Sequence, residues 1–515
     1  MRLTVGNPQR GGVARLGGGA LRPGVVRHLL NARLVALGAA TALLVACAGL
    51  PAKLPRATPL AEAPIDAPPA PGGIWPERSW WRVYRDPTLD RLVGEGLAGS
   101  PSLAGARRRF ESARAAVRVA GAAAGARVDL QGSAHRQRLS DNGLFPPRLL
   151  GFNWYNQADL GLRASYTFDW WGRERAAVAA AADEARVAAA ERADAALTLE
   201  QGIAEAYFGW QADQQRLAIA REELDAARRD RRIAAARVRA GLDSGESVRR
   251  ADLQVATSRA TIAALSGSAR LRVVALAALV GRPVSKLPPL VPRALPVIRG
   301  KVPADVRVAL LARRPDVAAS RWRVEAARQD AAAARAAFYP DISVDALAGL
   351  SSIDLGKLLE YGSRVPQAGV ALDLPIFDSG LLRARFGASR ARLRAAVAGY
   401  DATVVGAARD VATQAATLDW VAAERRERRR AVDAAQRLRD SAAARVRRGL
   451  SDARPEIAAE QTLLAQRDFL AQLDAAAVSA DVALRRALGG GYGEAASRAA
   501  SAALVPTSIN GQHSP

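Results

Sequence analysis

The chain has 515 residues, a formal net charge of +24, and 50% hydrophobic but only 5% aromatic residues. Its abundance of Ala, Leu, Arg and Glu predicts a mainly helical protein with more than one domain. One cysteine and 3 scattered histidines exclude a zinc site with several such ligands. No basic patch with interleaved aromatics or nucleic-acid module is present, so we interpret the arginine surplus as solvated helix faces rather than nucleic-acid binding.

The N-terminal segment has the pattern of a secretory signal. Basic residues precede an apolar run at 34–46, which is too short to span a bilayer and ends at Cys47. Residues 44–47 (LVAC) resemble the bacterial lipobox, which implies a signal peptide at 1–46 and a covalent lipid on Cys47. Ala48 rather than Asp follows, and the resemblance then implies the outer membrane. The alternative is a buried free cysteine in an ordinary helix; no cofactor besides the lipid is predicted.

Residues 47–76 are rich in Pro and Ala and show little periodicity. This composition predicts a lipidated, extended linker before the first domain.

A proline-free stretch at 172–282 is far longer than a usual helix, so it predicts two helices joined by a turn. The break falls at residues 241–245 (GLDSG), where glycine supplies the left-handed conformation that ends a helix. Ser244 and Ser247 are the candidate N-caps of the second helix.

The same helical hairpin recurs at 380–489. AARVRAGL at 235–242 returns as AARVRRGL at 443–450, and Pro455 then suits the first turn of a return helix. Each first helix would run for roughly 65–70 residues, or about 100 Å at 1.5 Å per residue. Helices this long are stable only when they pack side by side.

These matches predict a tandem duplication, with a first repeat at 77–290 and a second at 301–491. Each repeat also places a shorter Ala/Arg-rich helix, at 102–124 and 316–338, ahead of its long hairpin. Residues 492–515 are predicted to be a disordered C-terminal tail.

Between the short and long helices the hydrophobic period changes from 3.6 to 2. Residues 157–170 alternate cleanly between apolar and polar side chains, and shorter alternations surround them, which predicts β-hairpins at about 127–170 and 341–376. Strands of about ten residues with one apolar face suit a transmembrane barrel; a half-buried soluble sheet is the alternative. Four strands cannot close a useful bore, so strands in lipid demand an oligomer.

Several motifs together resemble the outer-membrane efflux protein family, the TolC-like channels, in its OprM-like (NodT-type) lipoprotein branch. The resemblance covers roughly residues 75–491. The motifs that carry it are WWRVYRDPTLD at 80–90, YTFDWWGR at 166–173, AYF at 206–208, LARRPDV at 311–317, AFYPDIS at 337–343 and PIFDSG at 375–380.

The resemblance implies a mainly α fold with a small β part. A homotrimer would pool four strands per chain into a twelve-stranded barrel in outer-membrane lipid, and its helical hairpins would form an α-barrel tunnel across the periplasm. The hairpin tips would contact a periplasmic adaptor protein, which links the channel to an inner-membrane pump, with the RND type favoured. The adaptor-contact residues implied are Arg237, Gly241, Leu242, Arg445, Gly449 and Leu450. The alternative is that the two glycines serve only the turns.

The sequence departs from the family at the expected pore constriction. Ala458 stands where family members often carry an acidic residue, so Asp452, Arg454 and Glu456 are the candidate constriction residues. Charged rings at a narrow point set ion selectivity.

The function expected is a passive exit duct for small toxic molecules in a tripartite efflux system. The alternatives are a duct for type I protein secretion and a periplasmic coiled-coil lipoprotein without a pore. No phosphate-binding GxxxxGK[ST] loop and no catalytic constellation is visible, so we do not expect an enzyme.

Overall fold

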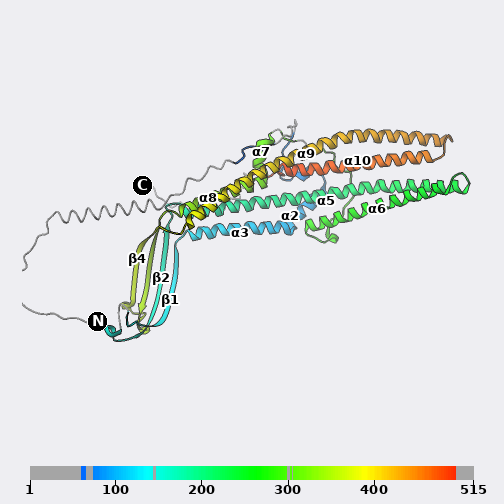
Figure 1. Cartoon of the computed structure of the whole chain (residues 1–515). Helices are drawn as coiled ribbons and strands as arrows, with labels where there is room; N and C mark the ends of the chain where they lie inside the picture. Colours follow the sequence, from blue (N-terminus) through cyan, green and yellow to red (C-terminus); the bar gives the residue numbers. More distant parts are fainter. Residues whose placement is uncertain (1–58, 65–72, 143–146, 299–301, 304, 494–515) are drawn as a thin grey trace, which may run out of the picture.

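The computed structural model describes residues 59–64, 73–142, 147–298, 302–303 and 305–493. The predicted signal peptide, Cys47 and tail residues 494–515 lie outside these residues. Long helices and one small sheet make up most of the described chain (Figure 1). The helices of more than one turn are α2 Pro87–Gly99, α3 Pro101–Ala123, α5 Arg173–Arg239, α6 Gly245–Val280, α7 Val306–Arg313, α8 Pro315–Ala336, α9 Leu381–Arg447 and α10 Arg454–Ala487.

Short helical turns complete the order: η1 Trp80–Tyr84, α4 Pro147–Leu150, η2 Val284–Lys286, η3 Leu355–Lys357 and η4 Tyr361–Ser363. The predicted short helices are confirmed as α3 and α8. Each begins at a proline, which is tolerated there because an N–H in the first turn has no hydrogen-bond partner within the helix.

The two long hairpins lie side by side in one layer. Helices α5 and α9 each have 67 residues, as their proline-free stretches predict. α6 packs on α5, α5 on α10 and α10 on α9, so the order across the layer is α6–α5–α10–α9 (Figure 1). Pro455 lies in the first turn of α10, as predicted. The helices α6 and α9 therefore form the two edges of the layer.

The sheet extends away from the helical tips at the opposite end of the molecule (Figure 1). It contains β1 Arg127–Arg138, β2 Trp154–Phe168, β3 Asp341–Ser352 and β4 Arg364–Asp373, all antiparallel in the order β1-β2-β3-β4. β2 begins three residues before the alternating stretch at 157–170, because its outer end pairs fully with the outer end of β1. The pairing of β2 with β3, which joins the two hairpins, was not predictable from the separate alternations.

The register places like residues on the same face of the sheet. Leu130 lies opposite Leu162, and Leu160 lies opposite Leu350, so one face is apolar across three strands. The other face carries polar side chains such as Asp159, whose carboxylate accepts hydrogen bonds from Ser133 and Ser351 at 3.1 and 2.7 Å. Pro366 lies within β4, which is an edge strand in the sheet of a single chain, where proline is tolerated.

Two hydrophobic clusters lie part-way along the long helices, where the shorter helices pack on them. One joins η1, α2 and the middle of α5, and includes Trp80, Leu89 and Ile203. The other joins α7, α8, α9 and the end of α10, and includes Leu310 and Val404. Towards the tips only small clusters remain, so the outer halves of the hairpins depend on close Ala-mediated packing and on polar contacts.

Residues of the predicted linker and of the predicted tail pack against the helices, which the sequence did not lead us to expect. Ala63 is fully buried, and its N–H donates to the carbonyl oxygen of Arg307 at 3.0 Å. At the other end, Tyr492 packs against a cluster of α5 and α8. The ordered chain therefore includes parts of both segments, since these residues bury apolar surface against the helices.

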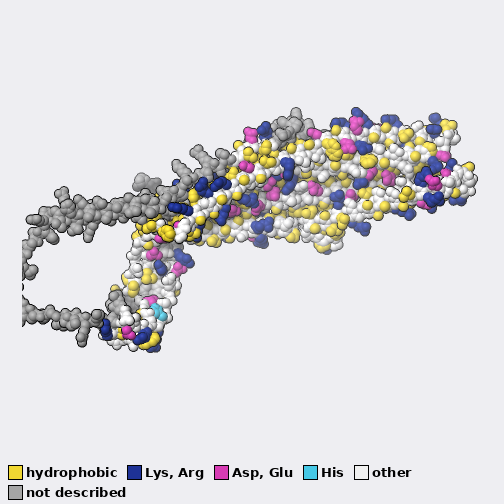
Figure 2. All heavy atoms as spheres, viewed as in Figure 1, with side chains coloured by type: hydrophobic (Ala, Val, Ile, Leu, Met, Phe, Trp, Pro, Cys, Tyr) yellow, Lys and Arg dark blue, Asp and Glu magenta, His cyan; other side chains and the backbone are white. Residues whose placement is uncertain are grey.

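Arginine and lysine side chains are distributed along the helical layer among acidic ones rather than gathered in one patch on the face shown (Figure 2). This distribution agrees with the interpretation of the positive charge as solvated helix faces.

Candidate functional site: the helical tips and the open edges

The predicted tip residues of both hairpins lie at the same end of the molecule (Figure 1). Gly241 and Gly449 follow the last residues of α5 and α9, and both have φ of +70°. This left-handed conformation ends a helix at little cost only for glycine and a few polar residues. The sequence prediction of two matching turns is therefore confirmed.

The two turns have the same hydrogen bonds. The N–H of Leu242 donates to the Arg237 carbonyl oxygen, and the N–H of Leu450 donates to the Arg445 carbonyl oxygen, both at 2.9 Å. These bonds satisfy helix carbonyls that would otherwise lack a partner. The leucines project into solvent, with 67% and 66% of their surface exposed. Each tip thus presents one apolar side chain on a rigid turn.

Ser244 occupies the N-cap position of α6, but its side chain makes no capping bond. Ser247 instead donates its hydroxyl to the Ser244 carbonyl oxygen at 2.8 Å. The prediction of a serine cap is correct in position and wrong in its contact, because the Ser247 N–H that a Ser244 side chain would accept from donates to the Ser244 carbonyl oxygen at 3.1 Å.

Four ion pairs connect the residues just behind the tips. Arg237 lies 3.6 Å from Asp243 and 3.4 Å from Asp452, while Arg454 lies 3.4 Å from Asp243 and 3.6 Å from Asp230. Asp243 therefore receives one arginine from each hairpin. We call these five residues the tip ion-pair cluster. A hydrogen bond from the Ser244 N–H and the charges of Arg454 and Arg237 lower the pKa of Asp243, so it is ionised at neutral pH.

The structure brings together only two of the three candidate constriction residues. Asp452 and Arg454 belong to the tip ion-pair cluster, whereas Glu456 lies half-exposed in the first turn of α10 outside it. Arg445 also takes no part in these pairs. Sequence reasoning missed Asp230 and Asp243. The signal for Asp230 was its spacing of seven residues from Arg237, which puts both side chains on one helix face.

Further arginine–carboxylate pairs join the hairpins below the tips. Arg216 on α5 contacts both oxygens of Asp468 on α10, at 2.8 and 3.1 Å. Arg229 of α5 also forms an ion pair with Glu460 of α10, closer to the tips. Ion pairs therefore join α5 to α10 within one chain.

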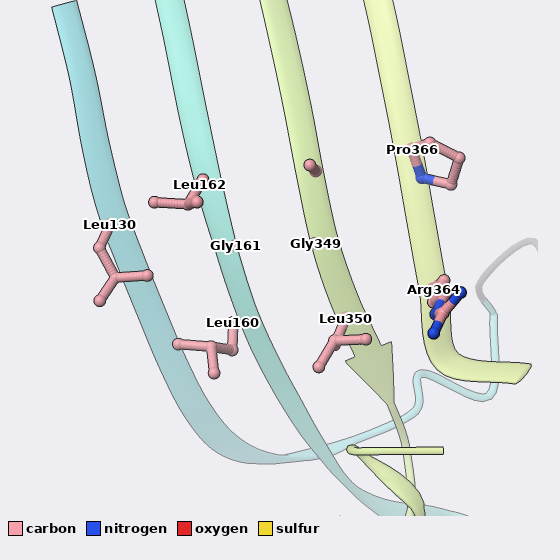
Figure 3. A pocket seen from close by; sticks show the side chains of 9 residues that line it. Leu130, Leu160, Gly161, Leu162, Gly349, Leu350, Arg364 and Pro366 are labelled. Atoms are coloured by element: carbon pink, nitrogen blue, oxygen red, sulfur yellow. The ribbon is translucent and has the colours of Figure 1, made fainter. Parts of the chain in front are cut away.

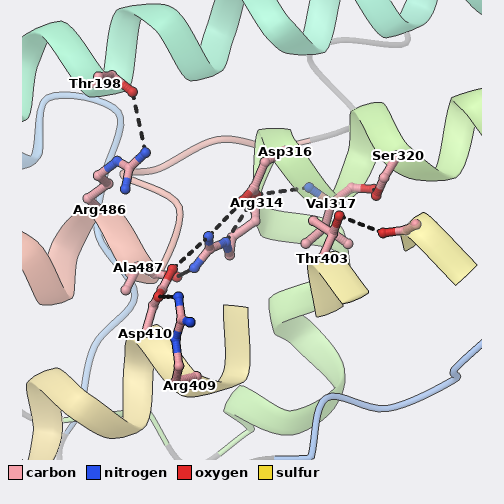
Figure 4. A network of polar contacts seen from close by, with 11 residues as sticks. Thr198, Arg314, Asp316, Val317, Ser320, Thr403, Arg409, Asp410, Arg486 and Ala487 are labelled. Atoms are coloured by element: carbon pink, nitrogen blue, oxygen red, sulfur yellow. Dashed lines mark hydrogen bonds and ion pairs between the residues drawn. The ribbon is translucent and has the colours of Figure 1, made fainter. Parts of the chain in front are cut away.

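A buried clamp fixes the base of the second hairpin (Figure 4). Arg314 is 6% exposed, and its guanidinium reaches Asp316 at 2.7 Å, Asp410 at 3.2 Å and the carbonyl oxygen of Ala487 at 3.2 Å. Burial opposes ionisation of Asp316, but the hydrogen bond and charge of Arg314 outweigh it and lower the pKa of this carboxyl. The clamp ties α8, α9 and the end of α10 together.

The sheet and the helical layer are both open at their edges. β1 and β4 each lack a second strand partner among the described residues. On the apolar face a shallow groove crosses the four strands, lined by leucines of β1, β2 and β3, with Arg364 and Pro366 of β4 at one side (Figure 3). A single copy would leave strand hydrogen-bonding groups and an apolar surface uncovered.

The edge helix α6 shows the same incompleteness. Among the described residues it is the one helix long and apolar enough to cross a membrane, yet only 22% of its apolar window is buried in the single chain. Leu253, Leu271 and Val274 are 68%, 71% and 55% exposed. Because α6 lies beside α5 in the helical layer, this apolar surface fits a protein neighbour.

The chain matches a known protein family and several of its members. The family model described as outer membrane efflux protein matches residues 92–282 and 306–490. The multidrug resistance outer membrane protein MdtP of Escherichia coli (strain K12) is 34% identical over 425 residues, which cover 81% of this chain and 87% of MdtP.

Solved structures share the fold. The outer membrane protein VceC from Vibrio cholerae is 32% identical, with a TM-score of 0.74 over 81% of this chain and 100% of VceC. The outer-membrane channel OprN is 27% identical, with a TM-score of 0.77 over 86% of this chain and 99% of OprN. With both helical hairpins and the sheet inside these matches, the chain belongs to the outer membrane efflux protein family and is an outer-membrane protein.

Proposed function

We propose that three copies of this chain form the outer-membrane exit duct of a tripartite efflux system. The observation that carries the proposal is that the sheet and the helical layer are both open, at β1 and β4 and at α6 and α9. Repetition around a threefold axis pairs β1 of one copy with β4 of the next. It also covers the edge helices α6 and α9 with helices of neighbouring copies. The result is a twelve-stranded barrel continued by a ring of helices.

The dimensions suit this role. A helix of 67 residues spans about 100 Å at 1.5 Å per residue, which is long enough to carry a tunnel through most of the periplasm. The apolar face of the sheet would lie in lipid and its polar face would line the pore. Substrates are proposed to be small toxic molecules, as the name of the multidrug-resistance relative suggests.

The tips are the proposed adaptor contacts. Arg237, Gly241 and Leu242 of the first hairpin have the same backbone arrangement as Arg445, Gly449 and Leu450 of the second. Trimer and tandem duplication together present this arrangement repeatedly around a ring. A periplasmic adaptor with helical hairpins would bind there and link the duct to an inner-membrane pump, with the RND type favoured. Asp452, Arg454 and Glu456 would lie near the closed end of the pore.

Cys47 is the proposed lipid anchor. Cleavage after residue 46 would leave it as the N-terminal residue, and several acyl chains hold a protein on a membrane where one chain does not. Mass spectrometry of the N-terminal peptide of the mature protein tests this point.

The test of the duct is retention of a fluorescent pump substrate by cells that lack the gene. Wild type should restore export, whereas Gly241→Trp combined with Gly449→Trp should not. Nothing lies within 4 Å of an added Cβ at either glycine, so folded packing is spared and the change falls on the turn and its contacts. Gly241→Asn combined with Gly449→Asn is the matched control, because asparagine tolerates positive φ.

Unchanged retention in the deletion strain would contradict small-molecule export and favour the protein-secretion duct. Restored export by the double tryptophan variant would contradict a role for the tips in docking.

A further inference from the structure

The far end of the apolar sheet face carries arginines. Along β1, Val128, Leu130, Gly132 and Ala134 lie on this face, and the same alternation continues to Arg136 and Arg138. On β4 the same face holds Arg364, which lies opposite Leu350 of β3. A face that is apolar nearer the helices therefore becomes cationic at the end remote from them.

These arginines are exposed and stand beside aromatic rings. The Arg136 guanidinium lies 5.5 Å from the ring centre of Trp154, and the Arg364 guanidinium lies 4.1 Å from that of Tyr361. Trp154 and Tyr361 are 50% and 79% exposed. Neither Arg136 nor Arg364 forms an ion pair with a carboxylate of the described residues. Aromatic and cationic side chains together are typical of the level where hydrocarbon meets headgroups.

Arg138 has one acidic neighbour, Asp141, at 3.2 Å, and both side chains are more than half exposed. Exposed pairs of this kind are weak and exchange readily with other partners. Arg138 is therefore available to a more strongly charged anion.

The proposed trimer brings these residues together across the contact between copies, which we call the seam. The β2–β3 pairing sets Ala158 opposite Ser352. β1 and β3 are equivalent strands of 12 residues, and β2 and β4 are equivalent strands that lead to Gly172 and Gly380. Transferring the pairing through these equivalences sets Arg138 of one copy opposite Pro366 of the next.

In that register Arg364 of one copy lies diagonally across from Arg138 of the next, at about 7–8 Å between backbones. Arg136 is two residues along the same face. Three long guanidinium side chains from two copies can then converge on one group at each seam. We call Arg136, Arg138 and Arg364 at the three seams the seam collar. The seam collar exists only if the trimer does, so this inference rests on the proposed function.

We propose that this seam collar binds the phosphate groups of the outer-leaflet glycolipid, the lipid A portion of lipopolysaccharide. The apolar face below the collar places its occupant in the bilayer, which excludes a soluble partner. Guanidinium groups bind phosphate through paired, charge-assisted hydrogen bonds, and lipid A carries phosphates at the depth where the apolar band ends. The lipid would bridge neighbouring copies and stabilise the barrel at its outer rim.

The first arm of the test needs no variant. Purified, delipidated wild-type trimer in detergent is heated with bisphosphorylated lipid A or with the same lipid after removal of both phosphates. The bisphosphorylated lipid should raise the midpoint of trimer dissociation, and the dephosphorylated lipid should not. Equal shifts would overturn the proposal, because acyl-chain contacts alone would then explain them.

The second arm compares two double variants. Arg136→Gln with Arg364→Gln removes collar charge, whereas Arg127→Gln with Arg163→Gln removes the same charge from the polar face, where each arginine pairs with an aspartate. Trimers are extracted from membranes and their bound lipid phosphorus is measured per chain. The collar variant should retain at most about one tenth of the tightly bound phosphorus per chain that wild type retains. The control variant should retain as much as wild type.

Equal retention by both variants would contradict the collar. A wild type that is monomeric by cross-linking in the same samples would contradict the proposed function instead. A trimeric wild type that binds both forms of lipid A equally contradicts only the lipid site.

Discussion

Asp243 is the residue at which the two hairpins meet. It accepts arginines from both, at 3.6 Å from Arg237 and 3.4 Å from Arg454, although it lies in a solvent-exposed turn. Exposed pairs add little to overall stability, and their value here is geometric, since they hold one tip against the other. Single side chains at this end can thus alter the tip without unfolding the protein.

Replacing Asp243 with Asn should loosen the tip. Arg237 and Arg454 each lose a charged partner, so we expect a higher single-channel conductance in planar bilayers and almost no change in the thermal midpoint. Glu246→Gln is the control, because Glu246 pairs with Arg250 on its own helix. Equal conductance for both variants would show that the cluster does not restrict the pore.

The pairs of Asp243 are present at neutral pH because its folded pKa is lowered. Their contribution should hold above the unfolded value of about 3.9 and disappear as the pH falls through the lower folded value.

Glu200 gives a second residue-scale prediction. It is 8% exposed and accepts a hydrogen bond from the Trp80 indole at 2.9 Å. Burial raises its pKa to about 7, against the opposing effect of this hydrogen bond. A raised carboxyl pKa means that folding binds a proton, so stability falls as the pH rises from about 4.5 to about 7.

Glu200→Gln should remove this loss while keeping an acceptor for Trp80. Relative to wild type, the variant should gain on the order of 3 kcal/mol between pH 4.5 and pH 7 and show no further gain above pH 7. Thermal unfolding of both proteins across this range measures it. Glu205→Gln on the same helix is the control, and a pH-independent difference for Glu200→Gln would refute the assignment.

At the scale of elements, charged contacts between helices replace a thick hydrophobic core. The outer halves of α5 and α10 meet through pairs such as Arg216–Asp468, and the Arg314 clamp closes the base of α8, α9 and α10. A buried arginine with two carboxylates is costly to break, because removing it leaves uncompensated charge behind.

Arg314→Met should therefore destabilise the second hairpin by about 3–5 kcal/mol. Its neighbour Arg313 stacks on Trp75 at 4.6 Å, half-buried, and Arg313→Met should cost about 1 kcal/mol or less. Urea unfolding followed by circular dichroism compares the two. Similar losses for both variants would contradict the clamp.

At the scale of the whole molecule, the chain is an incomplete ring. Its apolar edge helix α6 needs a neighbour, and so do its edge strands β1 and β4. Assembly and partner docking should consequently be separable, because the residues for each lie far apart: Leu271 in the last third of α6 and Leu242 at the tip.

Leu271→Asp should reduce the trimer fraction seen by cross-linking in membranes, since a charge would replace an apolar contact between copies. Leu242→Asp should leave trimers intact and impair substrate export in cells. Normal trimers for Leu271→Asp would place the neighbour contact elsewhere.

The sequence by itself determined the elements of this protein. Glycine and proline positions located both tip turns and the start of α10, and the change of period from 3.6 to 2 located the strands, because these signals are local. Only the tertiary structure decided the partners. The contacts of Arg314 with Asp410 and of Tyr84 with Asp481 join residues 96 and 397 positions apart. So does the pairing of β2 with β3, and such contacts depend on how packed elements meet in space, which no local pattern encodes.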